Sequence, residues 1–405
     1  MARARKLKLN RNTGPYPVAF IATLTIIQIF GLLMLFSASY ATGYLQHGDS
    51  YYYIWDQLIY TLLGEGVMIV ASCFDYHWLH RWTKWLYLVC LILLCVVLTC
   101  EPINNCRRWL HWDGVPIPSI QPSEITKFAM ILLTAHIMCT YRARRNTFRY
   151  GFVYPLVPLV PVIALMFFEP HLSGMILICT IVCSIMLLGG SGGKYLLGLA
   201  GLGAAGVWLL YNFAADKIEY VMERLEGWTS DLTKMPWQTY QSLLAIGSGG
   251  LTGMGLGNSM EKQLWLPECT NDFIFSVVCE ELGFIGALLV IFLFIALILQ
   301  GLAIAYNAAD LYGTLIAIGI TAQVAWQVFC NIAVVTNSMP NTGISLPFFS
   351  SGGTSLVMLL GEMGILLNIA RQGAAAAARE KAQGQAQNAE QPPRAASRPG
   401  TAAAR

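Results

Sequence analysis

One acidic side chain, Asp272, stands immediately before a long apolar segment that runs from about residue 273 to residue 299. A charge beside hydrocarbon is costly and therefore rare, so a carboxylate in this position is a candidate functional residue. Its chemistry would be that of a base, because an Asp with an ordinary pKa of about 3.9 is ionised at neutral pH. The alternative interpretation is an N-terminal helix cap, in which the side chain accepts a hydrogen bond from an exposed backbone N–H.

Two adjacent arginines, Arg107 and Arg108, precede an aromatic residue, Trp109. Guanidinium groups bind phosphate oxygens through paired N–H donors, and an aromatic ring suits the same surface. The group therefore predicts a site for a phosphate at the membrane surface. The alternative is that the two long side chains only extend to the interface and bind no ligand.

A second charged pair, Glu124 and Lys127, follows Gln121 and Pro122. Proline suits the first turn of a helix, and residues three apart share one helix face, so the two charged side chains are expected to face the same way. One interpretation is an ion pair that lets two charges enter the membrane together. The other is a basic site for the diphosphate of a lipid.

Glycine and serine are frequent in two further segments, at residues 241–259 and 340–355. The glycine spacing of the first is similar to that of nucleotide-binding loops, but no strand signal precedes it and no Gly-Lys-Ser or Gly-Lys-Thr follows. We expect tight or broken backbone, which survives at membrane depth only where it is buried in protein or lines a polar cavity. Both segments are expected on the same face of the membrane as Arg108 and Asp272.

The composition of the chain indicates which kind of structure holds these residues in place. Of the 405 residues, 56% are hydrophobic and 12% are charged, and the mean hydropathy is +0.56. One soluble core cannot bury that much apolar surface, so the chain is predicted to be an all-α integral membrane protein. Apolar segments of about 17 to 25 residues, enough to cross about 30 Å of hydrocarbon, recur along the chain. The ten predicted transmembrane helices cover approximately residues 17–38, 54–74, 84–100, 122–140, 152–168, 174–190, 194–213, 273–299, 312–335 and 353–370.

Basic residues orient these helices, because Lys and Arg concentrate in cytoplasmic loops. They are dense near the N-terminus, at residues 142–149 and from residue 371 onward. Both termini are therefore expected in the cytoplasm, with one large extracellular loop between the seventh and eighth helices. The formal charge of +3 comes mostly from these flanks, which argues against a nucleic-acid partner.

This topology divides the chain into three parts. Residues 1–15 form a basic cytoplasmic tail, and residues 16–371 form the ten-helix membrane domain, which includes the outer loop 214–271. Within that loop, residues 219–225 could form a short amphipathic helix. Residues 372–405 lack aromatic side chains and are expected to be a disordered cytoplasmic tail.

The eleven cysteines do not indicate a disulfide framework, because most lie in or beside apolar segments. Cys100, Cys106 and Cys269 fall near the outer face, and a disulfide among them is an option that the sequence leaves open. The six histidines form no zinc motif with cysteine or glutamate, so no structural metal site is predicted.

Taken in order, these motifs resemble those of the SEDS family, the FtsW, RodA and SpoVE type proteins of bacterial cell-wall synthesis. The resemblance spans about residues 16–371. It implies a ten-helix peptidoglycan glycosyltransferase that polymerises lipid II at the outer face of the cytoplasmic membrane. The matching segments are Arg107–Leu110, Gln121–Glu124 with Lys127, Ala245–Gly250, Leu266–Phe275, Glu280–Gly283, Thr342–Ile344 and Gly352–Gly353.

The resemblance also implies roles for individual residues. Polymerisation in the family depends on the aspartate that matches Asp272. Substrate and diphosphate binding is expected from Arg107, Arg108, Trp109, Glu124 and Lys127, and the cavity is expected to be lined also by Gln121, Ser259, Glu268 and Ser350. Three positions depart from the family pattern: His171 stands where an aspartate is common, Asn271 replaces threonine, and Ser351 replaces tyrosine.

The expected reaction is transfer of a sugar from a lipid diphosphate to a sugar hydroxyl. It requires a base for the hydroxyl proton, for which Asp272 is suited, and cations for the departing diphosphate, which the basic residues supply. One carboxylate base with direct attack predicts inversion at the sugar carbon. A divalent cation, Mg²⁺ or Mn²⁺, would share the diphosphate charge, but no carboxylate cluster demands one.

The expected partners are lipid II, membrane lipid, a class B penicillin-binding protein transpeptidase and other division or elongation proteins. Residues 334–336 and 353–355 and the two tails favour an FtsW-type or SpoVE-type division protein, with a RodA-type elongation polymerase as the alternative. A lipid II transporter or flippase and a noncatalytic divisome scaffold are two further hypotheses. The convergence of polar motifs on one face favours surface chemistry over transport.

Overall fold

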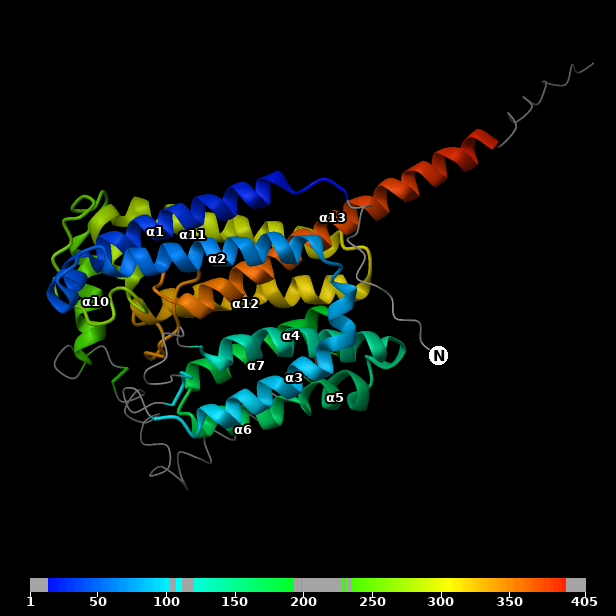
Figure 1. Cartoon of the computed structure of the whole chain (residues 1–405), viewed down its shortest axis with the longest axis horizontal. Helices are drawn as coiled ribbons and strands as arrows, with labels where there is room; N and C mark the ends of the chain where they lie inside the picture. The colour runs from blue at the N-terminus through cyan, green and yellow to red at the C-terminus, as the bar shows by residue number, and fades with distance from the viewer. Residues whose placement is uncertain are drawn as a thin grey trace, which may run out of the picture.

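The computed structural model describes residues 14–101, 107–110, 120–192, 195, 198, 227–228, 231 and 235–390. Apart from one isolated bridge, the regular structure of these residues is helical (Figure 1). The elements are α1 (Val18–His47), α2 (Tyr52–Cys73), α3 (His77–Val97), α4 (Pro122–Thr140), η1 (Arg142–Arg144), η2 (Phe148–Val153), α5 (Tyr154–Leu156), α6 (Leu159–Phe168), α7 (Leu172–Leu188), α10 (Trp237–Ser248), α11 (Ile274–Tyr306), α12 (Leu311–Val335) and α13 (Gly353–Glu390).

The predicted class, an all-α integral membrane protein, is confirmed. Seven helical segments of the described residues are long and apolar enough to cross a membrane. α4 and the shorter α7 coincide with two further predicted transmembrane helices. The predicted helix at 194–213 and the amphipathic segment 219–225 lie outside the described residues, so the number ten stays a prediction.

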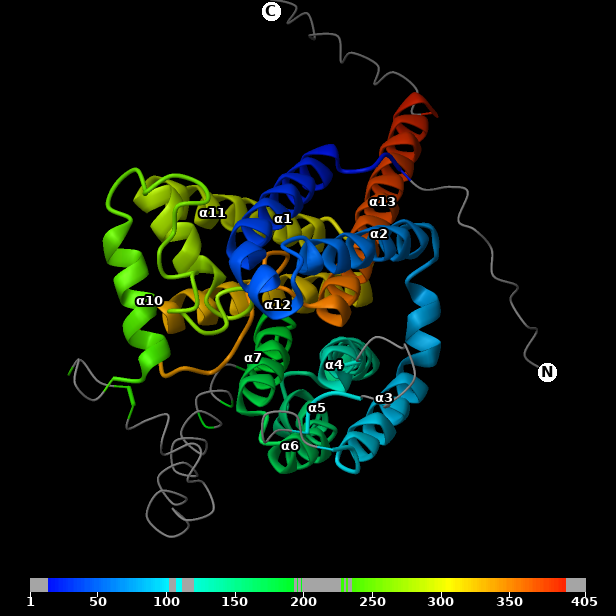
Figure 2. The ribbon, with the colours of Figure 1, turned by 60° about the vertical axis from the view of Figure 1, so that its left-hand side comes forward.

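The helices gather into two neighbouring groups (Figures 1 and 2). α1, α2, α11, α12 and α13 form one group, and α3, α4, α6 and α7 lie beside it. Within the first group, α2 packs along α13, and α11 packs against α12 and α1. α4 joins the groups because it contacts α3, α7 and α12, and it is buried along most of its length. The charged residues at the start of α4 are therefore held deep in the bundle.

α11 is interrupted at Gly283, whose φ of 66° and ψ of −167° are not helical. Such a break frees backbone groups, which must find partners inside a membrane protein. The glycine-rich segment after α10 provides them. Amides of this segment donate to Glu280 O and Glu281 O, and its carbonyls accept from the amides of Phe284 and Ile285, as the pairs Met254 N to Glu280 O (2.9 Å), Gly255 N to Glu281 O (2.9 Å), Phe284 N to Gly250 O (2.9 Å) and Ile285 N to Leu251 O (3.2 Å) show.

The glycines of this segment make the close approach possible. A Cβ atom added at Gly249 would collide with the backbone of Cys279, and one added at Gly253 would collide with that of Glu281. Gly253 also has a φ of 80°, which other residues rarely adopt. The glycine spacing therefore serves to pair a loop with a broken helix, and the predicted tight backbone is observed here.

Residues 372–390, which were expected to be disordered, are helical in the structure. They continue α13 well past Arg371, and the helix projects beyond the bundle in Figure 1. The cause is local propensity: a run of five alanines follows Gly373, and Ala is the strongest helix former. Residues 391–405 and residues 1–13 lie outside the described part of the chain.

We expect Gly283→Ala to destabilise the protein, because its Cβ would meet the backbone of Leu251 and Gly253 and its φ is positive. The cost should be at least about 2 kcal/mol and should lower the melting temperature in detergent by roughly 5 °C or more. Gly247→Ala is the matched control. It lies inside α10 with open space around its Cα, so it should melt at or above the wild-type temperature. Equal melting of the two variants would contradict this account of the break.

Candidate functional site

A cavity of about 520 Å³ lies at the end of the bundle where α4 and α11 begin. Several separate parts of the chain meet there: the starts of α4 and α7, the segment before α11, and the segment between α12 and α13. Most of the residues that line it are polar or charged, and it has the size of a ligand pocket. The predicted site residues that line it are Arg108, Trp109, Gln121, Glu124, Lys127, Glu268 and Asp272.

Asp272 lies in this cavity, two residues before α11 begins at Ile274. The N-cap position of α11 is Phe273, and no side-chain hydrogen bond caps the helix. Asp272 therefore precedes the N-cap position of α11 by one residue. As a lining residue, Asp272 lies where a ligand in the cavity would meet it.

Asn331 holds the backbone around Asp272. Its side-chain nitrogen Nδ2 donates to Asp272 O (2.7 Å) and to Ile344 O (2.8 Å), which ties the start of α11 to the segment before α13. Gly343 then passes beside the carboxylate, so that an added Cβ would lie 3.2 Å from Asp272 Oδ2. Any side chain at position 343 would therefore crowd the carboxylate of Asp272.

Glu124 and Lys127 form a buried ion pair, with Lys127 Nζ 2.8 Å from Glu124 Oε2. Pro122 occupies the first turn of α4, as its position in the sequence predicts. Both charged residues also line the cavity, so the ion-pair interpretation and the ligand-site interpretation are compatible with each other. Glu124 offsets the cost of holding an ammonium group at this depth.

Arg108 and Arg107 diverge. The isolated bridge between Leu110 and Ile120 brings the arginine segment beside α4, where Arg108 and Trp109 line the cavity and Arg108 Nη2 donates to Pro170 O. Arg107 Nη1 instead donates to Leu98 O at 2.7 Å, and Arg107 is not among the lining residues. Successive residues of extended backbone point in opposite directions, so one of the two predicted phosphate ligands does not reach the cavity.

Two predicted lining residues, Ser259 and Ser350, are also placed elsewhere. Ser259 is buried at the start of residues 259–272, the outer segment that precedes α11, and its hydroxyl donates to Glu280. The Ser350 hydroxyl donates to Asn271 O (2.7 Å) and accepts from Leu346 N (2.9 Å). Neither serine lines the cavity, whereas Ser351 and Gly352, next to Ser350, do.

Glu268 lies at the cavity wall in a strained backbone position, with a φ of 55°. Its carboxylate accepts from Asn271 Nδ2 (2.6 Å), and its carbonyl accepts from the amide of Asn271 (3.0 Å). Ser351 N donates to Thr270 O (2.9 Å) in the same region. The turn that precedes Asp272 is therefore held by hydrogen bonds within itself, between Glu268 and Asn271, and by one to the segment before α13, between Thr270 and Ser351.

Several lining residues were not predicted. This set includes Gln327 of α12, Ser123 at the start of α4, Ser173 at the start of α7, His171, Gln238 and Asn341. One sequence signal for part of it exists: Gln323, Gln327 and Asn331 recur every four residues along one face of α12, a polar stripe in an otherwise apolar helix. Gln323 Nε2 donates to the buried Glu362 at 2.9 Å, so the stripe continues below the cavity.

Glu169 is a further unpredicted acidic residue, in the turn between α6 and α7. It is almost completely buried, and burial raises its pKa to about 8, although the nearby charge of Arg108 opposes that shift. Below that pH the carboxyl of Glu169 is neutral in the folded protein.

Metal ligands and disulfides can be assessed only within the part of the chain that the structure describes. There, no three His, Cys, Asp or Glu side chains gather to hold a metal ion. Cys100 and Cys269 are free thiols, and Cys106, the third candidate for a disulfide, lies outside the described residues.

Known proteins resemble this chain over most of its length. A family model described as cell cycle protein, covering FtsW, RodA and SpoVE, matches residues 17–375. Stage V sporulation protein E of Bacillus subtilis is 38% identical over 365 residues, which are 89% of this chain and 98% of that protein. The probable peptidoglycan glycosyltransferase FtsW of Geobacter sulfurreducens is 34% identical, over 87% of this chain and 95% of that protein.

Solved structures show the same fold. The rod shape determining protein RodA of Thermus thermophilus superposes with a TM-score of 0.65 at 25% identity and covers 88% of this chain and 97% of that one. A chain from a peptidoglycan synthase complex, described as coordinating polymerization and crosslinking, superposes with a TM-score of 0.72 at 23% identity. It covers 88% of this chain and 98% of that one.

The burial of Glu169 leads to a pH-dependence that can be measured. The folded protein holds this proton up to about pH 8, whereas an unfolded chain releases it near 4.5, so stability falls as the pH rises between these values. We expect the wild-type melting temperature to fall from pH 6 to pH 9 and Glu169→Gln to flatten much of that fall. Glu101→Gln, which removes an exposed carboxylate, should keep the wild-type slope. An unchanged slope in Glu169→Gln would show that Glu169 is already ionised at pH 6.

Proposed function

Because this chain belongs to the FtsW, RodA and SpoVE family of cell cycle proteins, we propose that it is a peptidoglycan glycosyltransferase that polymerises lipid II. The observation that carries this proposal is one cavity that holds a carboxylate, Asp272, together with two cations, Arg108 and Lys127. A transfer from a lipid diphosphate needs both kinds of group. The cavity would face the outer side of the bacterial cytoplasmic membrane, where the positive-inside pattern puts this end of the bundle.

Asp272 is the general base of the proposed reaction. A sugar hydroxyl of the acceptor attacks the anomeric carbon of the donor, and Asp272 takes the hydroxyl proton as the new carbon–oxygen bond forms. The bond from the anomeric carbon to the diphosphate breaks, and the diphosphate leaves with the electron pair. With one base and one direct displacement, the anomeric configuration inverts.

Arg108 and Lys127 stabilise the charge of the departing diphosphate. Glu124 does not compete with Asp272 as the base, because its carboxylate is paired with Lys127. Its role is to keep the Lys127 ammonium oriented in the cavity wall. A Mg²⁺ or Mn²⁺ ion brought by the diphosphate would add to this charge, and its involvement stays a prediction.

The relatives also support a proposal for the setting of the reaction. We propose that a class B penicillin-binding protein transpeptidase cross-links the strands that this protein makes, in line with the synthase complex that shares its fold. Several relatives named FtsW, and one sporulation protein, are at least 32% identical, which supports a role in division or sporulation. A RodA-type role in elongation would use the same chemistry.

We expect Asp272→Asn to lower the rate of glycan polymerisation from lipid II by about 10²-fold to 10⁴-fold, because the amide cannot accept the hydroxyl proton. The assay uses purified protein with its transpeptidase partner and analyses the polymer. Asp49→Asn, which changes an exposed carboxylate after α1, is the control and should polymerise at the wild-type rate. Abundant polymer from Asp272→Asn would exclude the proposed base.

A vesicle assay separates polymerisation from transport. Lipid II transfer between leaflets should be the same for the wild type and Asp272→Asn. Transfer that depends on Asp272 in the absence of polymer would support the flippase hypothesis instead.

Arg107 and Arg108 offer a matched pair of variants. Arg108→Gln removes a cation from the cavity and should raise the KM for lipid II and lower kcat, together by at least about 10-fold in kcat/KM. Arg107→Gln should stay within about 2-fold of the wild type, because its guanidinium is bonded to Leu98 O away from the cavity. The reverse order of effects would mean that Arg107, not Arg108, binds the diphosphate.

A further inference from the structure

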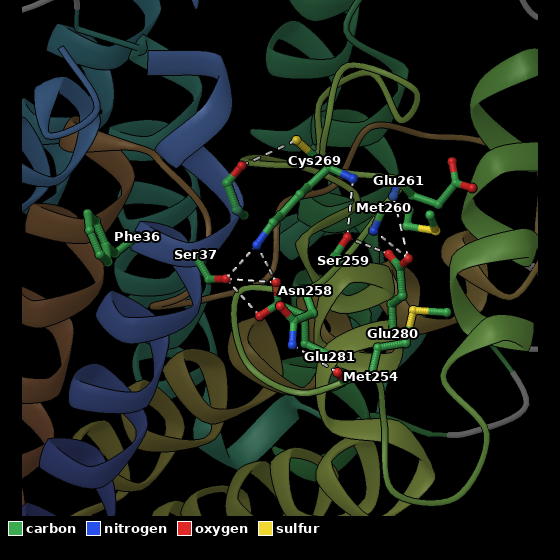
Figure 3. Close-up of polar contacts among 12 residues, drawn as sticks. Phe36, Ser37, Met254, Asn258, Ser259, Met260, Glu261, Cys269, Glu280 and Glu281 are labelled. Carbon is green, nitrogen blue, oxygen red and sulfur yellow. Dashed lines mark hydrogen bonds and ion pairs between the residues drawn. The ribbon is translucent and has the colours of Figure 1, made fainter. Parts of the chain in front are cut away.

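A second cluster of buried charges lies outside the cavity, where the outer segment before α11 meets α1 and α11. Figure 3 shows its two halves: Ser37 of α1 faces Glu281, and Ser259 of the outer segment faces Glu280. Glu280 and Glu281 are adjacent on α11, just before the break at Gly283. None of these residues lines the cavity.

Lys262 and Glu281 form the charged centre of this cluster. Lys262 Nζ lies 2.6 Å from Glu281 Oε1 and 3.0 Å from Ser37 Oγ, and the Ser37 hydroxyl donates to Glu281 at 2.7 Å. Glu281 is 0% exposed and Lys262 only 4%. Removing two charges from water is expensive, so the pair must be held by its geometry and by the additional hydroxyl.

Glu280 is satisfied in a different way. Its carboxylate accepts from the Ser259 hydroxyl and from the amides of Met260 (2.8 Å) and Glu261 (3.4 Å). The backbone of residues 259–261 therefore wraps around one carboxylate, and Lys262, the next residue, reaches the other. The start of the outer segment is attached to α11 at two consecutive glutamates.

The outer segment is also attached to α1 at two consecutive residues. Lys262 contacts Ser37, and the thiol of Cys269 lies 3.7 Å from Ala38 O. A backbone hydrogen bond from Leu266 N to Glu261 O (2.8 Å) closes the outer segment on itself. Asp272 follows Cys269 by three residues, so the segment that delivers Asp272 to the cavity is fixed to the bundle directly before it.

We propose that the Lys262–Glu281 ion pair is a positioning device for Asp272. The pair fixes the register of the outer segment on α1 and α11, and through Cys269 and the turn at Glu268 it fixes the direction of the Asp272 carboxylate. An apolar contact of similar area would hold the outer segment without fixing its position along α1 and α11. An ion pair whose two charged groups also share the Ser37 hydroxyl is directional and fixes that position. The inference rests on the proposed function, because it assigns the pair an effect on turnover through Asp272.

The test compares kinetics per folded molecule with thermal stability. The proteins are the full-length wild type and Lys262→Met, each with its transpeptidase partner, assayed with lipid II. Positioning predicts a fall in kcat of about 10-fold to 100-fold at nearly unchanged KM, since small displacements of a catalytic group have effects of this size. The charge-exchanged double variant Lys262→Glu with Glu281→Lys should recover part of that kcat.

Asp310→Asn is the control for loss of stability alone. Asp310 accepts from Tyr76 (2.6 Å) and contacts His77 Nε2 (2.9 Å) at the start of α12, where the chain is expected to face the cytoplasm. This variant should melt at a lower temperature with a wild-type kcat. If Lys262→Met does not yield folded protein, Ser37→Ala replaces it. That variant removes only the bridging hydroxyl and should lower kcat about 3-fold.

The outcomes separate the two proposals. A kcat within 2-fold of the wild type in Lys262→Met, or in Ser37→Ala if that variant is used, overturns the positioning role and leaves the proposed function intact. A kcat loss in Asp310→Asn as large as that in Lys262→Met, at a similar loss of melting temperature, also overturns it, because the effect would then follow stability. A wild type that makes no polymer overturns the proposed function, and the positioning role with it.

Discussion

The cost of leaving a polar group without a partner inside a membrane protein governs this structure. Most of the chain meets that constraint with continuous helices. Where α11 breaks at Gly283, the freed backbone is paired with the glycine-rich loop after α10. The two lysines that are buried in the described part of the chain each have an opposite charge, because Lys127 is paired with Glu124 and Lys262 with Glu281. The polar atoms so arranged lie at the same end of the bundle as the cavity. The candidate site is therefore built at the end of the bundle where the helices are interrupted and the buried charges are paired.

The candidate site is a composite of chain segments that are distant in sequence. Lys127 comes from the first turns of α4, Arg108 from a segment held by one bridge to residue 120, and Asp272 from the turn before α11. Each is fixed by a bond to a different neighbour, and Asn331 joins two of the segments directly. This explains why so many side chains around the cavity bind backbone rather than ligand. Their contribution is to hold a small number of charged groups at fixed relative positions.

Sequence patterns predicted the helices well because hydropathy reports burial in lipid directly. They also selected Asp272, Glu124 and Lys127, because a charged residue next to an apolar segment can be recognised from the linear sequence. The patterns did not separate Arg108 from Arg107, or Ser351 from Ser350, because the direction of a side chain in a loop depends on which carbonyls or amides lie nearby. Glu169 was missed since its burial arises from packing between α6 and α7. The tail after Arg371 was predicted to be disordered from its lack of aromatic residues, whereas alanine propensity continues the helix.

The interruption of α11 also has a mechanical meaning. An unbroken helix of this length behaves as a rod, and a tilt imposed on its lower half would move its upper end by several ångströms. At Gly283 the rod is divided, and the upper half, which carries Glu280 and Glu281 and begins beside Asp272, is fastened to the glycine-rich loop and the outer segment. A tilt of the lower half would therefore not have to pass through the helix axis to the upper half. The geometry of the turn that carries Asp272 then depends on the contacts of the upper half and not on the tilt of the lower one.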